Sequence, residues 1–485
     1  MASPLPDLSS SPWRDRVRVL TDAPVRDGDY VLYWMTSARR TTWNLALERA
    51  VRWAEALERP LLVFEPLRAG HRWASLRHQA FLWQGMEDNA RALSGTCASY
   101  LPYVEPSHGD GRGLLHRLAS RAALVVGDHS PAYFLPRMTA AAAKTLPARL
   151  EVVDGTGLLP LWSTDRIFHR AHDLRRHLHR SVADYLGVSP LSDPLKGARI
   201  PDGIRLPDLS PWPTATSLDA LQVDRSVGAV ALRGGPVAAN ARWSEFLTER
   251  LTGYEEHRNH PDEDGASGLS PYLHHGHISP HQLFHQLTRA EGWTPDRITG
   301  PPNGRREGFW GLSPGAEAFL DQLLTWRELG YRAAEHQPCY DQYHSLPDWA
   351  RATLEAHEAD PRPHLYPLDA LESARTRDPI WNAAQRQLLR EGVMHNYLRM
   401  LWGKRILEWT ETPAQAFDAM MYLNDRYALD GRDPNGVAGV AWVMGRYDRA
   451  WGPERQVYGK IRYMSSENTG RKLRLRRYLA RYGGR

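Results

Sequence analysis

Cysteine is nearly absent from this chain of 485 residues, which contains only Cys97 and Cys339. Two thiols so far apart in sequence exclude a disulfide framework and the paired spacing of a zinc site, and they suit a reducing cytoplasm. No apolar run reaches the roughly 18 residues of a membrane span. The first residues also lack the apolar stretch of a secretion signal. The sequence therefore predicts a cytoplasmic protein without a membrane segment.

Strong charge and the common nucleotide and metal motifs are also missing. The net charge is only +5, which permits an anionic partner such as nucleic acid but does not require one. The glycine fingerprint GxGxxG does not follow the first expected strand, so a standard dinucleotide site is not expected there. Clustered histidines occur without an HExxH motif or a third ligand, and we predict no metal site. These histidines are His274, His275, His277, His281 and His285.

Tryptophan and C-terminal basic residues, by contrast, are plentiful. The chain contains 18 Trp. Large aromatic side chains usually build the core, but this number raises the question of electron transfer or base stacking. Between Arg471 and Arg485 there are seven Arg or Lys and no acidic residue. This segment is either a solvated basic helix or a surface that contacts phosphates.

The order of apolar patterns predicts two domains of different class. Short apolar runs that alternate with helix-length segments predict a doubly wound parallel α/β sheet over residues 1–188. The expected strands are 31–35, 61–64, 100–104, 124–127 and 150–153. Six prolines between 189 and 213 exclude a single helix or a central strand, so we assign 189–236 to an interdomain connector. Helical patterns dominate afterwards and predict an all-helical domain over 237–485.

Three helical stretches of the second half allow either a functional or a purely structural interpretation. The turn Ser267-Gly268-Leu269-Ser270 opens a helix and either holds a phosphate or only caps the helix. Trp326 lies among polar residues and either stacks on a base or packs in the core. Trp402 and Trp409 share one helix face, with Trp381 on the preceding helix packed between or beside them. These indoles form either an electron-hopping path or ordinary core.

A polar, turn-rich loop over 423–436 is the fourth stretch of interest. Such a loop is either exposed to solvent or part of a ligand site. Asp430 in this loop could pair with a buried arginine such as Arg399, whose charge would favour an anionic ligand. Trp442 follows shortly after and offers another stacking surface.

Several segments, in this order, resemble one family. They are LSPYLHHGHIS (269–279), WREL (326–329), DPIWNAAQ (378–385), MHNYLRMLWGKRILEWTE (394–411), LNDRYALDGRDPNGVAGVAW (423–442), DRAWG (448–452) and GKIRYMS (459–465). The chain is similar, close to full length, to the photolyase/cryptochrome family, and within it to class II cyclobutane pyrimidine dimer photolyases. The resemblance implies an antenna-type α/β domain and a helical domain that binds FAD and carries out catalysis.

The resemblance also implies roles for individual residues. FAD contacts are implied for Tyr254, Ser267, Gly268, Leu269, Ser270, Arg399, Asn424 and Asp430, with Asn424 facing flavin N5. A photoreduction chain is implied, from proximal to distal, for Trp402, Trp381 and Trp409. Contacts to the damaged DNA are implied for Trp326, Met400, Trp442 and Arg462.

The implied reaction is the light-driven repair of cyclobutane pyrimidine dimers in DNA. Reduced anionic FAD absorbs blue light and donates an electron to the dimer, the dimer splits, and the electron returns. A dimer that pairs and stacks poorly is easier to flip out of the helix, and basic side chains such as Arg462 and the C-terminal arginines would hold phosphates. A deazaflavin-type antenna and a monomeric protein are also expected.

Two positions depart from the family pattern. Gln322, four residues before Trp326, stands where the family usually has Glu, and Gln cannot supply a proton to the dimer radical anion. His275 stands where the pattern usually has Phe. We therefore hypothesise less efficient repair or a different preferred lesion. The alternatives are a cryptochrome-like FAD photoreceptor, and a non-catalytic nucleic-acid-binding protein.

Overall fold

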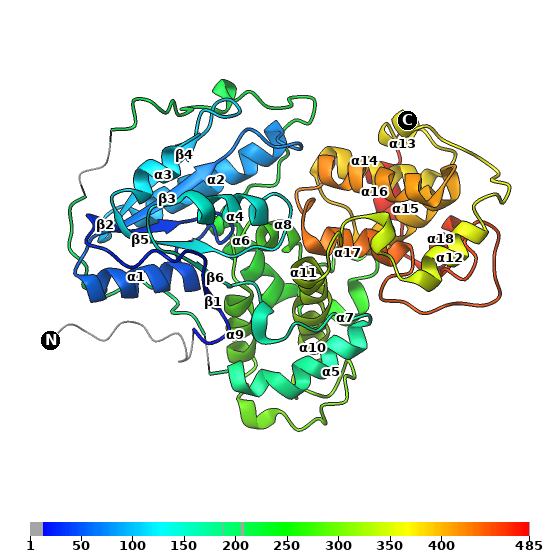
Figure 1. Cartoon of the computed structure of the whole chain (residues 1–485). Coiled ribbons are helices and arrows are strands. Elements are labelled where there is room, and N and C mark those ends of the chain that lie inside the picture. The colour runs from blue at the N-terminus through cyan, green and yellow to red at the C-terminus, as the bar shows by residue number, and fades with distance from the viewer. Residues whose placement is uncertain (1–12, 188, 205–207, 485) are drawn as a thin grey trace. The chain divides into compact units, whose positions relative to one another are not determined.

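The computed structural model describes residues 13–187, 189–204 and 208–484 (Figure 1). Its contacts divide the chain into two units that interleave along the sequence. The first unit comprises the chain up to Asp165, together with Ser181–Ser244 and Leu269–Gly292. The second unit comprises Arg166–Arg180, Glu245–Gly268 and the chain from Trp293 onwards. The domain boundaries inferred from sequence stay a prediction. Val188, the predicted end of the first domain, and Pro207, one of the six prolines that indicated the connector, lie outside the described residues.

The first unit contains a six-stranded sheet in the order β1-β6-β5-β2-β3-β4. The strands are β1 Val17–Val19, β2 Tyr30–Trp34, β3 Leu61–Leu67, β4 Ala98–Val104, β5 Ala122–Asp128 and β6 Leu150–Val153. β1 pairs antiparallel with β6, and all other neighbours are parallel. The predicted parallel α/β fold is confirmed, with an antiparallel edge strand that the sequence did not indicate.

Side chains of β2 alternate between two apolar clusters, as expected for a strand buried on both faces. Val31 and Tyr33 belong to one cluster, whereas Leu32 and Trp34 belong to the other. Helices of this unit are α1 Leu45–Leu57, α2 Leu76–Leu93, α3 Leu114–Ala119, α4 Leu135–Thr145, α6 Pro236–Glu245, α8 Ser270–His274 and α9 Pro280–Ala290. The described residues of the proline-rich segment before α6 form no α-helix.

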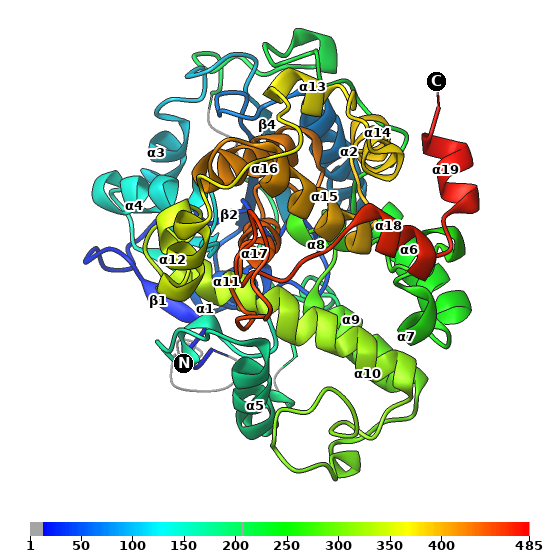
Figure 2. The same cartoon turned by 90° about the vertical axis from the view of Figure 1, so that its right-hand side faces the viewer.

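The second unit is helical, as predicted for the C-terminal part of the chain. Its helices are α5 Ala171–Ser181, α7 Tyr254–His257, α10 Pro314–Leu320, α11 Arg327–His336, α12 Asp348–Ala356, α13 Leu368–Glu372, α14 Pro379–Glu391, α15 Asn396–Trp409, α16 Pro413–Tyr427, α17 Pro434–Val443, α18 Ser466–Lys472 and α19 Arg476–Tyr482. Figure 2 shows α14, α15 and α16 side by side, and these helices contribute all three tryptophans and several other residues to one large apolar cluster.

Local signals in the sequence explain where the central helices begin. The side chain of Asp378 accepts hydrogen bonds from the backbone N–H groups of Ile380 and Trp381 at the start of α14. Thr412 caps α16 and Asp433 caps α17 in the same way. Each cap precedes a proline in the first turn, which lacks the N–H that would otherwise need a partner. Among the described residues, no helix is both long and apolar enough to cross a membrane.

Candidate functional site

Three elements bring a small polar group together: α15 carries Arg399, the end of α16 carries Asn424, and the loop before α17 carries Asp430. Arg399 Nη2 donates to Asp430 Oδ1 at 3.0 Å and to Oδ2 at 3.4 Å, and its Nη1 donates to Asn424 Oδ1 at 3.4 Å. The arginine and aspartate side chains are 18% and 12% exposed. A partly buried pair is screened less by salt than a surface pair. The pairing that the sequence suggested is formed, and its place beside a flavin stays a prediction.

Neighbouring backbone and side chains fix the loop that carries Asp430. Asp425 Oδ1 accepts hydrogen bonds from the Asn424 amide at 3.1 Å and from the Arg432 backbone N–H at 2.8 Å. A Cβ on Gly431 would lie 2.6 Å from the Asn424 carbonyl oxygen. The loop therefore passes so close to α16 that only glycine fits at this position, and the Asn424 side chain is held beside the ion pair.

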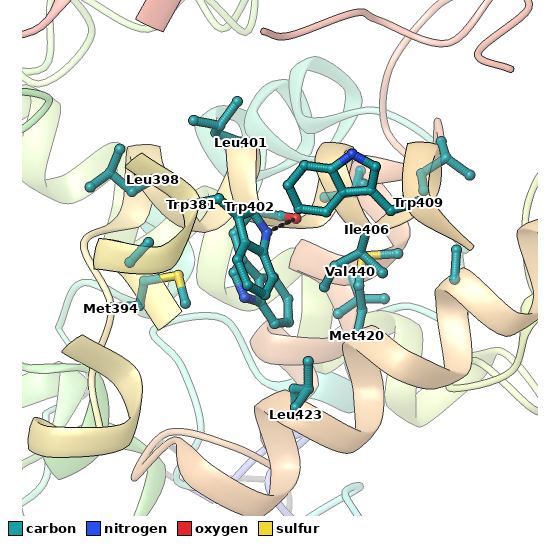
Figure 3. Packing of buried hydrophobic residues seen from close by; sticks show 14 of the residues in the cluster. Trp381, Met394, Leu398, Leu401, Trp402, Ile406, Trp409, Met420, Leu423 and Val440 are labelled. Carbon is teal, nitrogen blue, oxygen red and sulfur yellow. Dashed lines mark hydrogen bonds between the residues drawn. The ribbon is translucent and has the colours of Figure 1, made fainter. Parts of the chain in front are cut away.

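Three buried tryptophans from α14 and α15 form a continuous row (Figure 3). The ring centroids of Trp381 and Trp402 are 6.4 Å apart with the planes 4° apart, and those of Trp381 and Trp409 are 5.5 Å apart at 70°. Trp381 Nε1 donates to the Trp402 carbonyl oxygen at 3.0 Å, and Trp402 Nε1 donates to Gln385 Oε1 at 2.9 Å. Trp381 thus lies between the other two, and Arg399 precedes Trp402 by one helical turn.

The distal end of this row is buried as well. Trp409 is only 1% exposed. The partly buried ring of Tyr366 packs edge-on against it at 5.1 Å, and the Arg405 guanidinium lies 4.7 Å from its ring centroid. No motif or periodicity in the sequence indicated a role for Tyr366, which lies in a loop. Contacts of this length suit one-electron hopping between indoles and also suit a well-packed core, so geometry alone supports both interpretations.

Trp326 and Trp442 differ from the buried row because both are partly exposed. Both pack against one small apolar cluster, which consists of Phe168, Ala171, Leu174, Leu329, Ala438 and Tyr447. The methyl group of Met400 lies 3.8 Å from the position that a Cβ on Gly439 of α17 would take. The structure therefore gathers around α17 three of the residues implied in lesion contact, and leaves the two indoles accessible to a stacking partner.

The chain around Gln322 is wound as a π-helix rather than an α-helix. This segment, Asp321–Trp326, connects α10 to α11. π-helical turns are rare and occur frequently at functional sites. Gln322 and Trp326 are both partly exposed, whereas the three residues between them are buried. Asp321 anchors the segment by accepting a hydrogen bond from Arg175 Nε at 2.7 Å.

Arg462 is held by one carboxylate and two indoles. Its guanidinium donates to both oxygens of Asp448, at 2.8 and 3.2 Å. It lies 5.5 Å from the ring centroid of Trp442 and 4.2 Å from that of Trp451. Burial acts to raise the pKa of Asp448, but hydrogen bonds from Arg462, the Arg449 amide and Trp451 outweigh burial and leave this pKa below its ordinary value. The Arg462 side chain is 39% exposed, so it can also contact a phosphate.

Lys404 is a charged residue of this region that sequence reasoning missed. It lies in the middle of α15, is 0% exposed, and donates a hydrogen bond to the Val443 carbonyl oxygen. Burial lowers the pKa of Lys404 to about 7, although the nearby Asp448 acts in the opposite direction. A signal for its burial was present, because the apolar residues of α15 are spread around the helix instead of forming one stripe, as is typical of a helix inside the protein.

The titration of Lys404 should make stability depend on pH. Its pKa of about 7 in the folded protein lies below the ordinary 10.5, so between these values the unfolded chain binds a proton that the folded chain does not. Relative to K404M, the wild type should therefore gain stability as the pH rises through this window. One pKa unit is worth about 1.4 kcal/mol. Across this window the melting temperature of the wild type should therefore rise by several degrees relative to that of K404M. Parallel curves of melting temperature against pH for the two proteins would contradict this.

Tyr254 is placed by aromatic contacts in the second unit. Its ring meets those of Phe246 at 5.2 Å and Phe319 at 5.9 Å, edge-on in both cases. The side chain is buried, and this burial raises the pKa of its hydroxyl. Phe246 begins another π-helical segment, Phe246–Arg250. The structure thus packs Tyr254 among aromatic rings, while its contact with FAD stays a prediction.

The turn at 267–270 combines a glycine in the left-handed region with the start of α8. Gly268 has a φ of 68°, a conformation that favours glycine. Leu269 occupies the N-cap position of α8 and has no capping side chain, and Pro271 lies in the first turn. The chain passes from the second unit to the first between Gly268 and Leu269. Phosphate binding by this turn stays a prediction, and so does the alternative that its serines only cap the helix.

The clustered histidines all lie in the first unit. His277 and His281 are each 1% exposed. Burial lowers the pKa of His277 to about 3, so its imidazole is neutral. His275 packs among aromatic rings, with its centroid 5.3 Å from that of Phe81. Across the described part of the chain, no three His, Cys, Asp or Glu side chains are grouped so that they could hold a metal ion.

The basic C-terminal segment is partly neutralised by ion pairs. Arg474 pairs with Glu263 at 2.9 Å and Arg481 pairs with Glu391 at 2.6 Å. Both arginines remain more than half exposed, at 61% and 70%. Phosphate contact and simple solvation therefore both stay open for this segment, and Arg485 lies outside the described residues.

Three curated proteins similar to this chain are each named deoxyribodipyrimidine photo-lyase. The protein of Methanothermobacter thermautotrophicus is 36% identical over 477 residues, which cover 97% of this chain and 98% of that one. The protein of Potorous tridactylus is 31% identical, covering 95% of this chain and 83% of that one. The protein of Oryza sativa subsp. japonica is 33% identical, covering 96% and 90%. The similarity therefore extends over nearly the whole length of each chain.

A solved structure supports the fold. The chain superimposes on a bacterial class III photolyase from Agrobacterium tumefaciens with a TM-score of 0.67, over 95% of this chain and 88% of that one. The identity is 19%, so this likeness concerns the fold alone. No protein-family model matches the chain.

Proposed function

This chain belongs to the photolyase/cryptochrome family, and we propose that it repairs cyclobutane pyrimidine dimers in DNA with the energy of blue light. One observation carries the proposal. The second unit combines an ion-paired arginine next to a row of three indoles with two partly exposed indoles that border one apolar cluster. The first group suits a redox cofactor, and the second suits a flat aromatic substrate.

The residues present fit FAD. The Arg399 guanidinium would stabilise a reduced, anionic flavin ring, and the Asn424 amide beside it can donate or accept at flavin N5. We assign the remaining FAD contacts to Asp430, Tyr254 and the turn 267–270. Bound reduced FAD would supply the photoexcited electron that splits the dimer. Trp402 is the member of the indole row nearest in sequence to Arg399, and we propose that the row re-reduces oxidised flavin.

The lesion site is proposed around α17. Trp326 and Trp442 would stack on a dimer that has been flipped out of the duplex, and flipping is easier for a lesion that pairs poorly. Met400 would lie under the dimer, and Arg462 would contact phosphate. We further propose that the protein is a monomeric class II enzyme with a deazaflavin-type antenna in the first unit.

Lesion choice is tested with two oligonucleotides of one sequence, one carrying a thymine dimer and the other a (6-4) photoproduct. Each lesion blocks a restriction site, so repair restores cleavage. We expect restoration only for the thymine dimer and only in the light. If cleavage returned only for the (6-4) substrate, the lesion that the protein repairs would be the (6-4) photoproduct and not the thymine dimer. Flavin reduction without restoration of either would favour a photoreceptor.

The replacement Gln322→Glu should raise the repair yield per absorbed photon severalfold, because a carboxylic acid can supply the proton that an amide cannot. Gln322 and Trp326 belong to the same π-helical segment, so the new acid would remain close to the stacking indole. Repair yield is measured under limiting light, with binding of the same oligonucleotide in the dark as the control. An unchanged yield would show that this position does not limit repair.

A further inference from the structure

Lys404 is the buried cation of the proposed lesion site, and it does not reach the surface. It is 0% exposed in α15. Burying an ammonium group without a partner is costly, and fully buried lysines are rare for this reason. A leucine or methionine would pack in an apolar helix without that cost. The contacts of the Lys404 head group should therefore explain why a lysine is present.

The head group contacts two consecutive residues at the end of α17. Lys404 Nζ donates a hydrogen bond to the carbonyl oxygen of Val443, the last residue of this helix. The last carbonyls of a helix lack partners within the helix and carry partial negative charge, so a cation is favoured there. The same Nζ lies 5.5 Å from the ring centroid of Trp442, within the range of a cation–π contact. One amine thus fixes both the backbone and the indole.

A second cation approaches the same indole from the C-terminal segment. The Arg462 guanidinium also lies 5.5 Å from the Trp442 centroid, and Asp448 accepts two hydrogen bonds from it. The charge of Asp448 also acts to raise the pKa of Lys404. The Tyr458 hydroxyl donates to the backbone carbonyl oxygen of Lys404 at 2.8 Å. The two cations differ in exposure, because Arg462 is 39% exposed. Arg462 can touch DNA, whereas Lys404 can act on DNA only through Trp442.

We infer that Lys404 is a positioning residue that orients Trp442 for stacking on the flipped pyrimidine dimer; the inference rests on the proposed function. Trp442 is held before substrate arrives, so less freedom is lost on binding. Removing the ammonium should weaken binding of damaged DNA and leave binding of undamaged DNA unchanged. The salt dependence of binding should also stay the same, because Lys404 neutralises no phosphate.

The test is made at pH 6, below the Lys404 pKa of about 7, so that the amine is protonated. It measures binding in the dark of a labelled oligonucleotide with one thymine dimer and of its undamaged counterpart, at several salt concentrations. The variants are K404M, K404Q, W442F and the double variant K404M/W442F. We expect K404M to bind damaged DNA about tenfold more weakly and undamaged DNA as the wild type does. K404Q, whose amide can still donate to Val443, should have an affinity for damaged DNA between those of K404M and the wild type. When K404M is added to W442F, the affinity for damaged DNA should fall by less than about a further twofold.

Arg449→Met provides a matched control. Arg449 lies 4.4 Å from the ring centroid of Trp451, so this variant removes an exposed cation from a neighbouring indole. It should affect damaged and undamaged DNA equally. If K404M does not fold, as judged by circular dichroism, K404Q carries the test.

The outcomes separate this inference from the proposed function. If W442F weakens binding of damaged DNA but K404M and K404Q bind it like the wild type, the inference fails and the lesion site stands. If the effects of K404M and W442F are fully additive, Lys404 acts independently of the indole and the inference also fails. If W442F itself binds damaged DNA like the wild type, the proposed role of Trp442 in lesion binding is wrong.

Discussion

Replacing Trp381 by phenylalanine should slow light-driven reduction of the oxidised flavin by at least about tenfold, the effect of a barrier about 1.4 kcal/mol higher. The ring of Trp381 bridges Trp402 and Trp409, at 6.4 and 5.5 Å. Phenylalanine fills most of the same space but is far harder to oxidise, so the row would be broken at its centre. The rate is read from the loss of oxidised flavin absorbance under blue light with an external reductant.

The matched control for this experiment is Trp310→Phe. Trp310 is also buried in the second unit, at 4% exposed, but its ring contacts are with Trp293 and Phe309 rather than with the row. Its variant should photoreduce like the wild type. Chemically reduced W381F should repair normally, because the row is not needed once the flavin is reduced. Wild-type photoreduction in W381F would show that the three indoles serve only as core.

Replacing Arg399 by methionine should weaken FAD binding by about thirtyfold, or roughly 2 kcal/mol. The variant removes the charge that would favour an anionic flavin and leaves Asp430, which is only 12% exposed, without its cation. A carboxylate that has lost this cation at this depth would repel an anionic ligand. Titration of the apoprotein with FAD, followed by flavin fluorescence, gives the dissociation constant.

Arg375→Met is the control for this change. Arg375 pairs with Asp369 at 3.1 Å, but both side chains are well exposed, at 66% and 70%. Exposed pairs contribute little to stability, so R375M should bind FAD like the wild type. If R399M also retained wild-type affinity, the ion pair would be structural and the FAD site would have to lie elsewhere.

The parallel strands could be predicted from sequence because strands buried on both faces leave continuous apolar runs. The run from Val31 to Met35 corresponds to β2, and later runs correspond to β3 to β6. β1 was missed for the opposite reason. It has three residues, none of them buried, and it pairs antiparallel at the edge of the sheet, where no apolar pattern is required.

The interleaving of the two units could not be predicted, because it depends on contacts between distant segments. Helix α9 belongs by its contacts to the first unit, and most of α5 belongs to the second, although nothing in either sequence says so. The π-helical winding at Asp321–Trp326 was also hidden. A π-turn differs from an α-turn by one residue, and the tertiary contacts around it decide which one forms.

The site was partly visible in the sequence. Opposite charges at Arg399 and Asp430 suggested a pair, and the structure forms it. The sequence could not tell that Trp381 is buried while Trp442 is partly exposed, since both are indoles among apolar neighbours. Nothing in the sequence connected Lys404 with Val443, because that hydrogen bond joins residues that lie 39 positions apart on two different helices.

Light-dependent repair by the purified protein is the most direct test of the account. The reduced, flavin-loaded protein is illuminated with an oligonucleotide that carries one thymine dimer, beside an identical sample kept in the dark. We predict that the absorbance of intact thymine returns in the light over many turnovers and stays unchanged in the dark. Photoreduction of the flavin without any return of thymine absorbance would contradict the proposed lyase and point to a photoreceptor.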